Sequence, residues 1–224
     1  MPMKKCHCLA LVLMTLALCF LSGCEGDTGL SGDVDPEKPA HTYTGLKQQK
    51  CAVMVWTDLR NRAEYGQIQL DLARLIQYQL EAELAPQDDK DEKKKAKPTV
   101  EFVNAASVAQ FQRAHPEIDG APIVDVAPRL GVSRVIYVEL EDFSAQSPTS
   151  IMILKGTAKA TLRVLEVADR KAKVAFEESG ISATYPPHAP EGVIPSDKVT
   201  VRTIYEGTLR ALADRIVARF EEKS

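Results

Sequence analysis

The sequence predicts an α/β (α+β) fold with a single mixed sheet, in which two buried central strands are combined with an antiparallel hairpin and packing helices. Three observations predict it. Residues 51–56 are a continuous apolar run, which is typical of a strand buried on both faces, and residues 132–140 are expected to form a second buried central strand. Residues 157–164 alternate between apolar and polar, as in a strand with one solvated face. Elsewhere apolar residues recur three or four positions apart, as on the buried stripe of a helix. This mixture of elements favours one layered domain.

The first buried strand leads into a long helix. Residues 51–56 form the strand, and Cys51 is expected to be a small buried apolar residue. The residues that follow, 57–62, are expected to form a polar loop. The apolar stripe of the helix then comprises Tyr65, Ile68, Leu72, Leu75, Ile76, Leu80 and Leu84.

Short elements are expected between the two buried strands. Residues 99–103 form a short strand, and residues 107–115 form a short helix that stops before a proline. Another short helix is expected around Pro128, because proline costs little in a first turn, with Asp125 as its amino-terminal cap. Gly131 is suited to end that helix in a left-handed conformation.

A hairpin and a final helix complete the domain. The strand over 157–164 has its solvated face made of Thr157, Lys159, Thr161 and Arg163. The chain turns at 167–171, and the partner strand changes phase between Phe176 and Ile181, so that Gly180 is expected to be a β-bulge. A proline-rich loop over 185–190 then leaves the sheet. The last helix presents a stripe of Tyr205, Leu209, Leu212, Ile216 and Phe220.

The first residues of the chain have the pattern of an export signal. Lys4 and Lys5 precede the apolar run from Leu9 to Leu21, which is shorter than the roughly 20 residues of a membrane span. The following sequence, Leu21-Ser22-Gly23-Cys24, resembles the lipobox of bacterial lipoproteins. The resemblance implies that residues 1–23 are a signal peptide and that Cys24 is lipidated with acyl chains such as palmitate. The alternative is an ordinary secretory signal with a cysteine at the cleavage site.

The rest of the chain divides into a tether and a domain. Residues 24–45, with the lipidated Cys24 at their start, contain glycines, prolines and acidic residues without an apolar period, as in a flexible tether. Residues 46–224 are expected to form one α/β domain. Within it, residues 86–98 are a run of mixed charges between two prolines, which predicts a disordered surface loop.

Charge and cysteine content exclude several classes of function. Loss of residues 1–23 removes two lysines and no acidic residue, so that 28 basic residues become 26 against 31 acidic ones. This acidic balance does not suggest a nucleic-acid partner. Three of the five cysteines leave with the signal peptide and Cys24 is acylated, so that Cys51 has no partner for an internal disulfide. No cofactor is expected.

Three short segments of the domain resemble a group of periplasmic proteins. The segments are Ala52-Val53-Met54-Val55, Leu130-Gly131-Val132-Ser133-Arg134-Val135-Ile136-Tyr137-Val138 and Leu162-Arg163-Val164-Leu165-Glu166-Val167. They are similar to segments of the amino-terminal domain of TolB, the curli pore CsgG and the lipoprotein activator LpoB. The resemblance implies a TolB-like fold over most of residues 50–222. The long alternating hairpins that a curli-type pore requires are missing, which disfavours pore formation.

No catalytic or metal-binding constellation is found in the sequence. None of the four histidines has a partner at a metal-like spacing, and neither a nucleophile elbow nor a phosphate-binding glycine loop is present. The strongest ligand-binding candidates are Glu139, Glu141 and Asp142 at the end of one buried strand, with Trp56 and Arg60 at the end of the other. Strand ends of this kind often hold ligands in α/β proteins, and they are also commonly solvated.

Two classes of function are open at this stage. The first is a non-enzymatic cell-envelope lipoprotein that is anchored to a membrane and faces the periplasm, where its domain meets a protein partner or forms a homo-oligomer. The residue that follows the lipidated cysteine is Glu25. An aspartate at this position would resemble an inner-membrane retention signal, so the glutamate favours the outer membrane. The alternative is a ligand-binding or hydrolytic envelope domain that uses the acidic strand ends around Glu139. A deep pocket joining Trp56, Arg60, Glu139 and Glu141 would favour the alternative.

Overall fold

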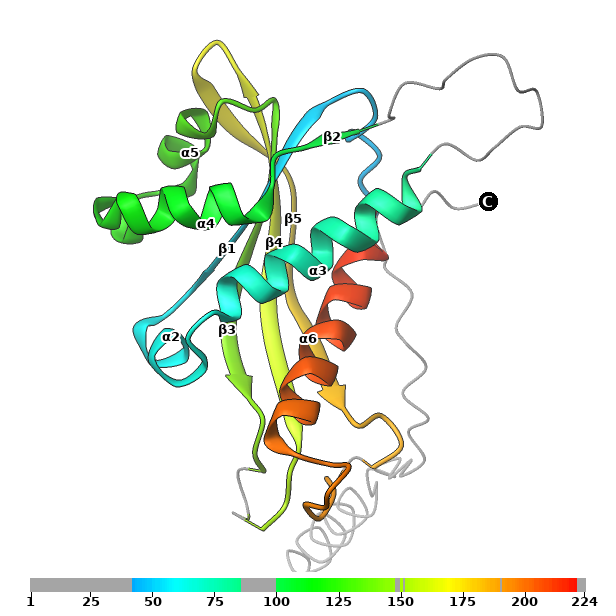
Figure 1. Cartoon of the computed structure of the whole chain (residues 1–224). Helices are drawn as coiled ribbons and strands as arrows, with labels where there is room; N and C mark the ends of the chain where they lie inside the picture. The colour runs from blue at the N-terminus through cyan, green and yellow to red at the C-terminus, as the bar shows by residue number, and fades with distance from the viewer. Residues whose placement is uncertain (1–41, 86–99, 148–149, 151, 190, 221–224) are drawn as a thin grey trace, which may run out of the picture. The chain divides into compact units, whose positions relative to one another are not determined.

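Five strands form one mixed sheet in the order β2-β1-β3-β4-β5 (Figure 1). The three strands β2, β1 and β3 are parallel, and β4 and β5 are added antiparallel as a hairpin. The strands are β1 (Lys50–Thr57), β2 (Glu101–Phe102), β3 (Arg134–Ser144), β4 (Gly156–Ala168) and β5 (Lys171–Tyr185). The predicted α/β class with a single mixed sheet is therefore confirmed.

The computed structural model describes residues 42–85, 100–147, 150, 152–189 and 191–220. They belong to one compact unit, Lys38–Ser224. The predicted signal peptide and Cys24, most of the tether and the charged loop over 86–98 lie outside the described residues.

Helices occur in the connections between the strands and after the last strand. They are α2 (Leu59–Tyr65), α3 (Ile68–Glu83), α4 (Ala105–Ala114), the 3₁₀ turn η2 (Pro116–Gly120), α5 (Ile123–Val126), the 3₁₀ turn η3 (Ala127–Leu130) and α6 (Val201–Val217). Two helices are long, α3 and α6, and both lie on the same face of the sheet (Figure 1). α3 packs on β1, whereas α6 packs on β4 and β5.

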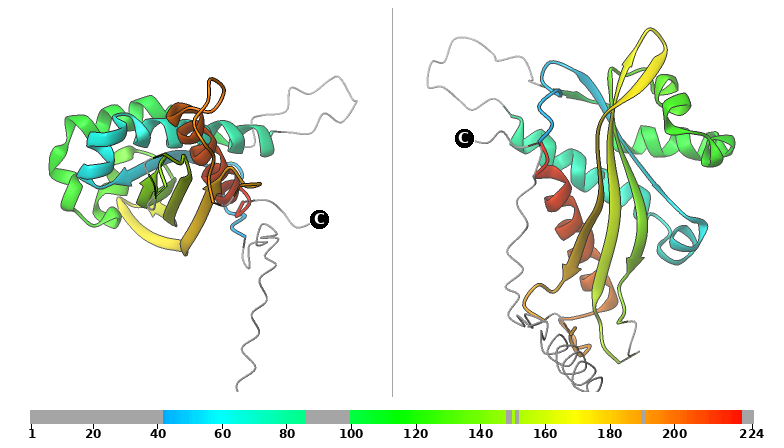
Figure 2. Two further views of the ribbon diagram at one scale, coloured as in Figure 1. Left: turned by 90° about the horizontal axis from the view of Figure 1, so that it is seen from below. Right: turned by 180° about the vertical axis from the view of Figure 1, so that it is seen from behind.

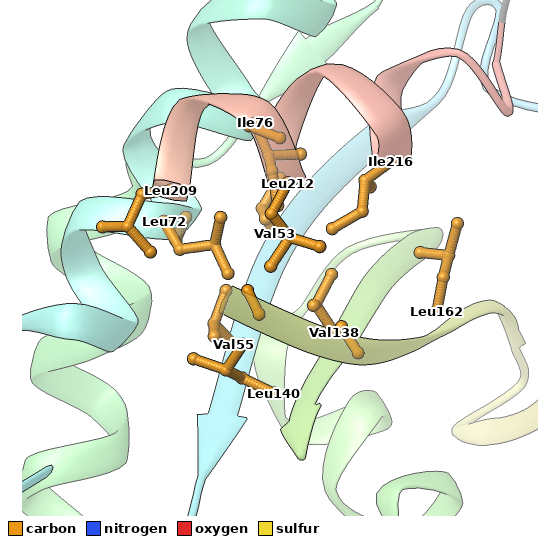
Figure 3. Packing of buried hydrophobic residues seen from close by; sticks show 14 of the residues in the cluster. Val53, Val55, Leu72, Ile76, Val138, Leu140, Leu162, Leu209, Leu212 and Ile216 are labelled. Carbon is orange, nitrogen blue, oxygen red and sulfur yellow. The ribbon is translucent and has the colours of Figure 1, made fainter. Parts of the chain in front are cut away.

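The α3–α6 face contains the larger hydrophobic core. Alternate residues of the strands, such as Val53, Val138 and Leu162, point toward it and are fully buried. Figure 3 shows Leu72 and Ile76 from α3 and Leu209, Leu212 and Ile216 from α6 above these strand residues. The predicted buried stripes are thus confirmed on both long helices, with Leu75, Leu84 and Tyr205 only partly buried. Tyr65, predicted on the same helix as Leu72, instead ends the separate helix α2.

The opposite face of the sheet is covered only in part. Ala52, Met54, Val135 and Tyr137 point to this side and pack against the short helices between β2 and β3, which form a second core. The view from behind in Figure 2 shows that the remaining length of β3, β4 and β5 has no helix over it on this side. The predicted solvated side chains lie there: Lys159 is exposed, Thr157 and Arg163 are partly exposed, and Thr161 is buried.

Several local predictions are confirmed by backbone geometry. Gly131 has φ 66°, in the left-handed region, and follows η3, which carries a proline in its first turn. Gly180 has φ 78° at a shift of the β4–β5 register. Two residues, Asp169 and Arg170, connect the hairpin, and both have positive φ, as the two-residue turns that match strand twist require.

Other local predictions are wrong. The expected polar loop over 57–62 contains the start of a helix, α2. The Asp58 carboxylate caps the amino terminus of this helix by accepting a hydrogen bond from the Asn61 backbone N–H at 2.8 Å. Asp125 is not a cap, since it lies inside α5. The second buried strand begins at Arg134 and continues to Ser144, past the predicted end at Leu140.

A second bulge in β5 was also missed. Leu165 pairs with Val174 and Val164 pairs with Phe176, so the residue between them, Ala175, has no cross-strand partner. The bulge turns Val174 away from the core that Phe176 contacts, and Val174 is 42% exposed.

Neighbouring glutamates in β5 provide a stability test with a built-in control. Arg219 is only 7% exposed and its guanidinium donates to Glu178 at 2.6 Å, whereas Glu177 pairs with the more exposed Arg163. Glu178→Gln should lower the unfolding free energy by about 2–3 kcal/mol, because a buried cation loses its partner. Glu177→Gln should cost at most about 1 kcal/mol. Equal losses in denaturant titrations of the two variants would contradict this assignment.

Candidate functional site

Two of the predicted ligand-binding residues, Trp56 and Glu139, lie side by side on neighbouring parallel strands. Trp56 of β1 is the register partner of Glu139 of β3, so both side chains point to the same face of the sheet. That face is the one only partly covered by short helices. Both residues line a cavity of about 250 Å³, which we call the Trp56 cavity.

The Trp56 cavity lies at the boundary between the covered and the uncovered part of this sheet face. Its walls come from the sheet on one side and from η2, α5 and the residues between them on the other. The lining residues are Met54, Trp56, Ile118, Asp119, Gly120, Ala121, Pro122, Ile123, Val126, Tyr137, Glu139 and Arg163. The wall is therefore mainly apolar and aromatic, with three charged side chains.

The charged side chains of the cavity are paired with one another or with neighbours. Arg163 Nη1 lies 2.9 Å from Glu139 Oε2, and Arg163 Nε lies 2.8 Å from Glu177 Oε1. Asp119 Oδ2 lies 2.7 Å from the guanidinium of Arg62 on α2. Two arginines thus face three carboxylates, which leaves one net negative charge around the cavity.

Tyr137 shows the influence of all three charged groups. Burial is the main cause that raises its pKa to about 12, and the carboxylates of Glu139 and Asp119 also raise the pKa while Arg163 lowers it. Glu139, Asp119 and Arg163 line the same cavity as Tyr137.

Trp56 has an unusual polar environment. Its indole nitrogen Nε1 is buried and has no hydrogen-bond partner among the described residues. A buried N–H without an acceptor costs about 1–3 kcal/mol, so most such groups in folded proteins have a partner. The described residues therefore leave this donor unsatisfied, although it is buried and not accessible from the surface.

The other predicted site residues lie outside the cavity. Arg60 is exposed on α2 and is not part of the lining. Glu141 binds Thr161 Oγ1 at 2.6 Å and Lys159 Nζ at 2.9 Å, farther along the uncovered sheet face. Asp142 is exposed beyond a register shift at Leu140/Asp142. The acidic residues were predicted at a strand end, but they lie inside β3, which the pairing with β4 extends.

Three polar or aromatic residues of the cavity were not predicted as site residues from the sequence. Arg163 was placed correctly on the solvated face of its strand, but nothing in one strand indicates which residue lies opposite. Tyr137 was interpreted only as part of a buried run. Asp119 lies in a connection whose path over the sheet has no periodic signal.

No group of three or more histidine, cysteine, aspartate or glutamate side chains that could hold a metal ion is present in the described part of the chain. Cys51 is fully buried, and burial raises the pKa of its thiol to about 12, which keeps it protonated and unreactive. His115 packs between Phe111, Glu117 and Arg129 at the end of α4.

Comparison with known proteins gives no family. No family model and no curated protein matches this chain. Similar solved structures include the hypothetical protein CT253 of Chlamydia trachomatis, with 13% identity and a TM-score of 0.39 over 76% of this chain and 92% of that one. Lipoprotein GNA1162 of Neisseria meningitidis has 14% identity and a TM-score of 0.37 over 69% of this chain and 91% of that one. A PelC dodecamer from Paraburkholderia phytofirmans has 8% identity and a TM-score of 0.40 over 83% of this chain and 95% of that one.

These scores are too low to carry a fold or a function from one chain to another. The resemblance to TolB, CsgG and LpoB therefore rests on three short sequence segments alone. In the structure the segments fall on β1, on the end of η3 with β3, and on β4.

The pairing of Glu141 predicts a pH-dependent contribution to stability. Hydrogen bonds from Thr161, and then from Lys159, lower the pKa of Glu141, so its contribution is present above the unfolded value of about 4.3 and is lost as the pH falls through the lower folded value. Glu141→Gln should therefore be less stable than the wild type near neutral pH, by at most about 1 kcal/mol, and equally stable in strong acid. Denaturant titrations across this pH range measure the difference. The control variant is Glu101→Gln, which removes an exposed carboxylate of the short edge strand β2.

Proposed function

We propose that this chain is a bacterial cell-envelope lipoprotein, anchored through Cys24, whose α/β domain binds a protein partner or other copies of itself without catalysing a reaction. The observation that carries the proposal is the sequence Leu21-Ser22-Gly23-Cys24 directly after a short apolar run with two lysines before it. Cleavage after Gly23 would free the amino group of Cys24 for acylation. The domain would then face the periplasm, and Glu25 favours sorting to the outer membrane.

Paired carboxylates support the non-enzymatic part of the proposal. A general acid or base needs a proton affinity matched to its task, which usually requires a carboxylate that is desolvated or placed beside another acid. Glu139 is paired with Arg163, and Glu141 is paired with Lys159 and has a lowered pKa. Both carboxylates thus join neighbouring strands through ion pairs, an arrangement suited to fixing strands and to recognising charge.

The outer edge of β5 supports association with a partner or a second copy. β5 spans 15 residues and pairs with β4 on one side, and its other edge has no strand partner among the described residues. Free edges of this kind accept an added strand. The bulges at Ala175 and Gly180 and the lysines at 171 and 173 restrict indiscriminate pairing, so only a complementary strand is favoured.

The alternative, a ligand-binding domain, has one observation in its favour. The Trp56 cavity joins Trp56 and Glu139, two of the four residues that would define such a site, but neither Arg60 nor Glu141. The two carboxylates that line it, Asp119 and Glu139, are both held in ion pairs with arginines, which favours recognition of a small group over hydrolysis.

Among the described residues, no helix is both long enough and apolar enough to cross a membrane. The proposed anchor is the lipid on Cys24.

Replacement of the lipidated cysteine tests the anchor. Cys24→Ala should abolish incorporation of labelled fatty acid and leave unprocessed precursor, because the thiol is the acceptor of the lipid. The control is Cys51→Ala, which removes a buried thiol inside the domain and should leave labelling unchanged. If salt alone washes the wild-type protein from membranes, the lipoprotein assignment is wrong.

A further inference from the structure

We propose that the Trp56 cavity binds the cationic end of a lysine or arginine side chain of a partner protein. The proposal deepens the proposed function, on which it rests, by naming the chemistry that the domain recognises. Three properties of the cavity support it: its size, its charge and its aromatic wall.

The size of the cavity matches one side chain better than a whole metabolite. Pockets that enclose small molecules usually measure about 300–1,000 Å³, whereas this cavity holds about 250 Å³. Met54, Ile118, Ile123 and Val126 give it apolar walls. Such walls accept the methylene stem of a lysine or arginine, which buries its carbon chain while its charged head stays near polar groups.

The charge of the cavity favours a cation. Arg163 is neutralised twice, by Glu139 and by Glu177, and Arg62 is neutralised by Asp119, so that one carboxylate charge is left over. Arg163 binds Oε2 of Glu139, and the other oxygen, Oε1, accepts no hydrogen bond from the described residues. An incoming ammonium or guanidinium would pair with this oxygen and balance the charge.

The aromatic wall completes the match. Trp56 and Tyr137 both line the cavity, and tryptophan is the side chain whose ring attracts cations most strongly. A free inorganic cation would pair with the carboxylate but would leave the apolar walls without a partner.

The chain provides its own reporter for a test. Trp56 is the only tryptophan of the full chain, so tryptophan emission reports on the cavity wall alone. The full-length protein in non-ionic detergent is titrated with N-acetyl-lysine amide, N-acetyl-arginine amide and the neutral analogue N-acetyl-norleucine amide. The two cationic probes should change the emission saturably, with a Kd on the order of 1 mM for so small a ligand, and the neutral analogue should not saturate.

Two glutamates on the same sheet face provide a matched pair of variants. Glu139→Gln removes the carboxylate that lines the cavity and should raise the Kd of the cationic probes about tenfold or more, which corresponds to about 1.4 kcal/mol. Glu141→Gln removes a carboxylate outside the lining and should leave the Kd within about twofold. Thermal unfolding of both variants verifies that they are folded.

Three results would overturn the proposal: no saturable change with either cationic probe, equal binding of the neutral analogue, or equal weakening in both variants. The titration needs neither acylation nor an identified partner. Its failure would therefore leave the anchoring result at Cys24 untouched, and failure of acylation would leave the titration valid.

Discussion

The fold depends on the burial of β1 and β3 on both faces while they pair with each other in parallel. Residues 51–55 alternate between the two cores without a polar side chain among them, and residues 135–138 of β3, which face residues 52–55, alternate between the same two cores. A strand of this kind is stable only if apolar layers cover both sides. At its far end the pair is joined by polar groups, since Thr57 donates to the Leu140 carbonyl at 2.8 Å and Asn61 donates to Thr57. α3 supplies this cover for β1 on one face and the short helices between β2 and β3 supply it on the other, while α6 continues the first layer over β4 and β5.

The two covers are unequal, and the candidate site follows from that inequality. α3 and α6 are long enough to cover one face along most of the sheet, whereas the short helices between β2 and β3 cover the other face only near one end (Figure 2). Beyond them, the sheet face can be solvated only if its side chains are polar, which explains the ion pairs from Glu139, Glu141, Lys159 and Arg163. Where the apolar cover stops, apolar walls and charged side chains meet in one cavity.

The sequence predicted those features that a local period or a single backbone requirement determines. The buried runs, the helix stripes, the left-handed Gly131 and the bulge at Gly180 are of this kind. It could not predict features that arise only between segments. The extension of β3 to Ser144 depends on pairing with β4, and the second β5 bulge depends on register. Trp56 and Glu139 could be named as candidates from their own strands. That Asp119, Tyr137 and Arg163 line the same cavity depends on contacts between segments, so the sequence alone could not show it.

Arg163 connects the two surfaces that the proposals use. Its guanidinium binds Glu139 in the cavity wall with one nitrogen and Glu177 of the edge strand β5 with another. The strand β5 has only one neighbouring strand, so its attachment to β4 depends more on such side-chain pairs than that of a central strand does. Glu139 of β3, Arg163 of β4 and Glu177 of β5 therefore form one series of ion pairs that joins the cavity wall to the edge strand. The guanidinium that holds Glu139 in place also helps to hold the free edge of the sheet.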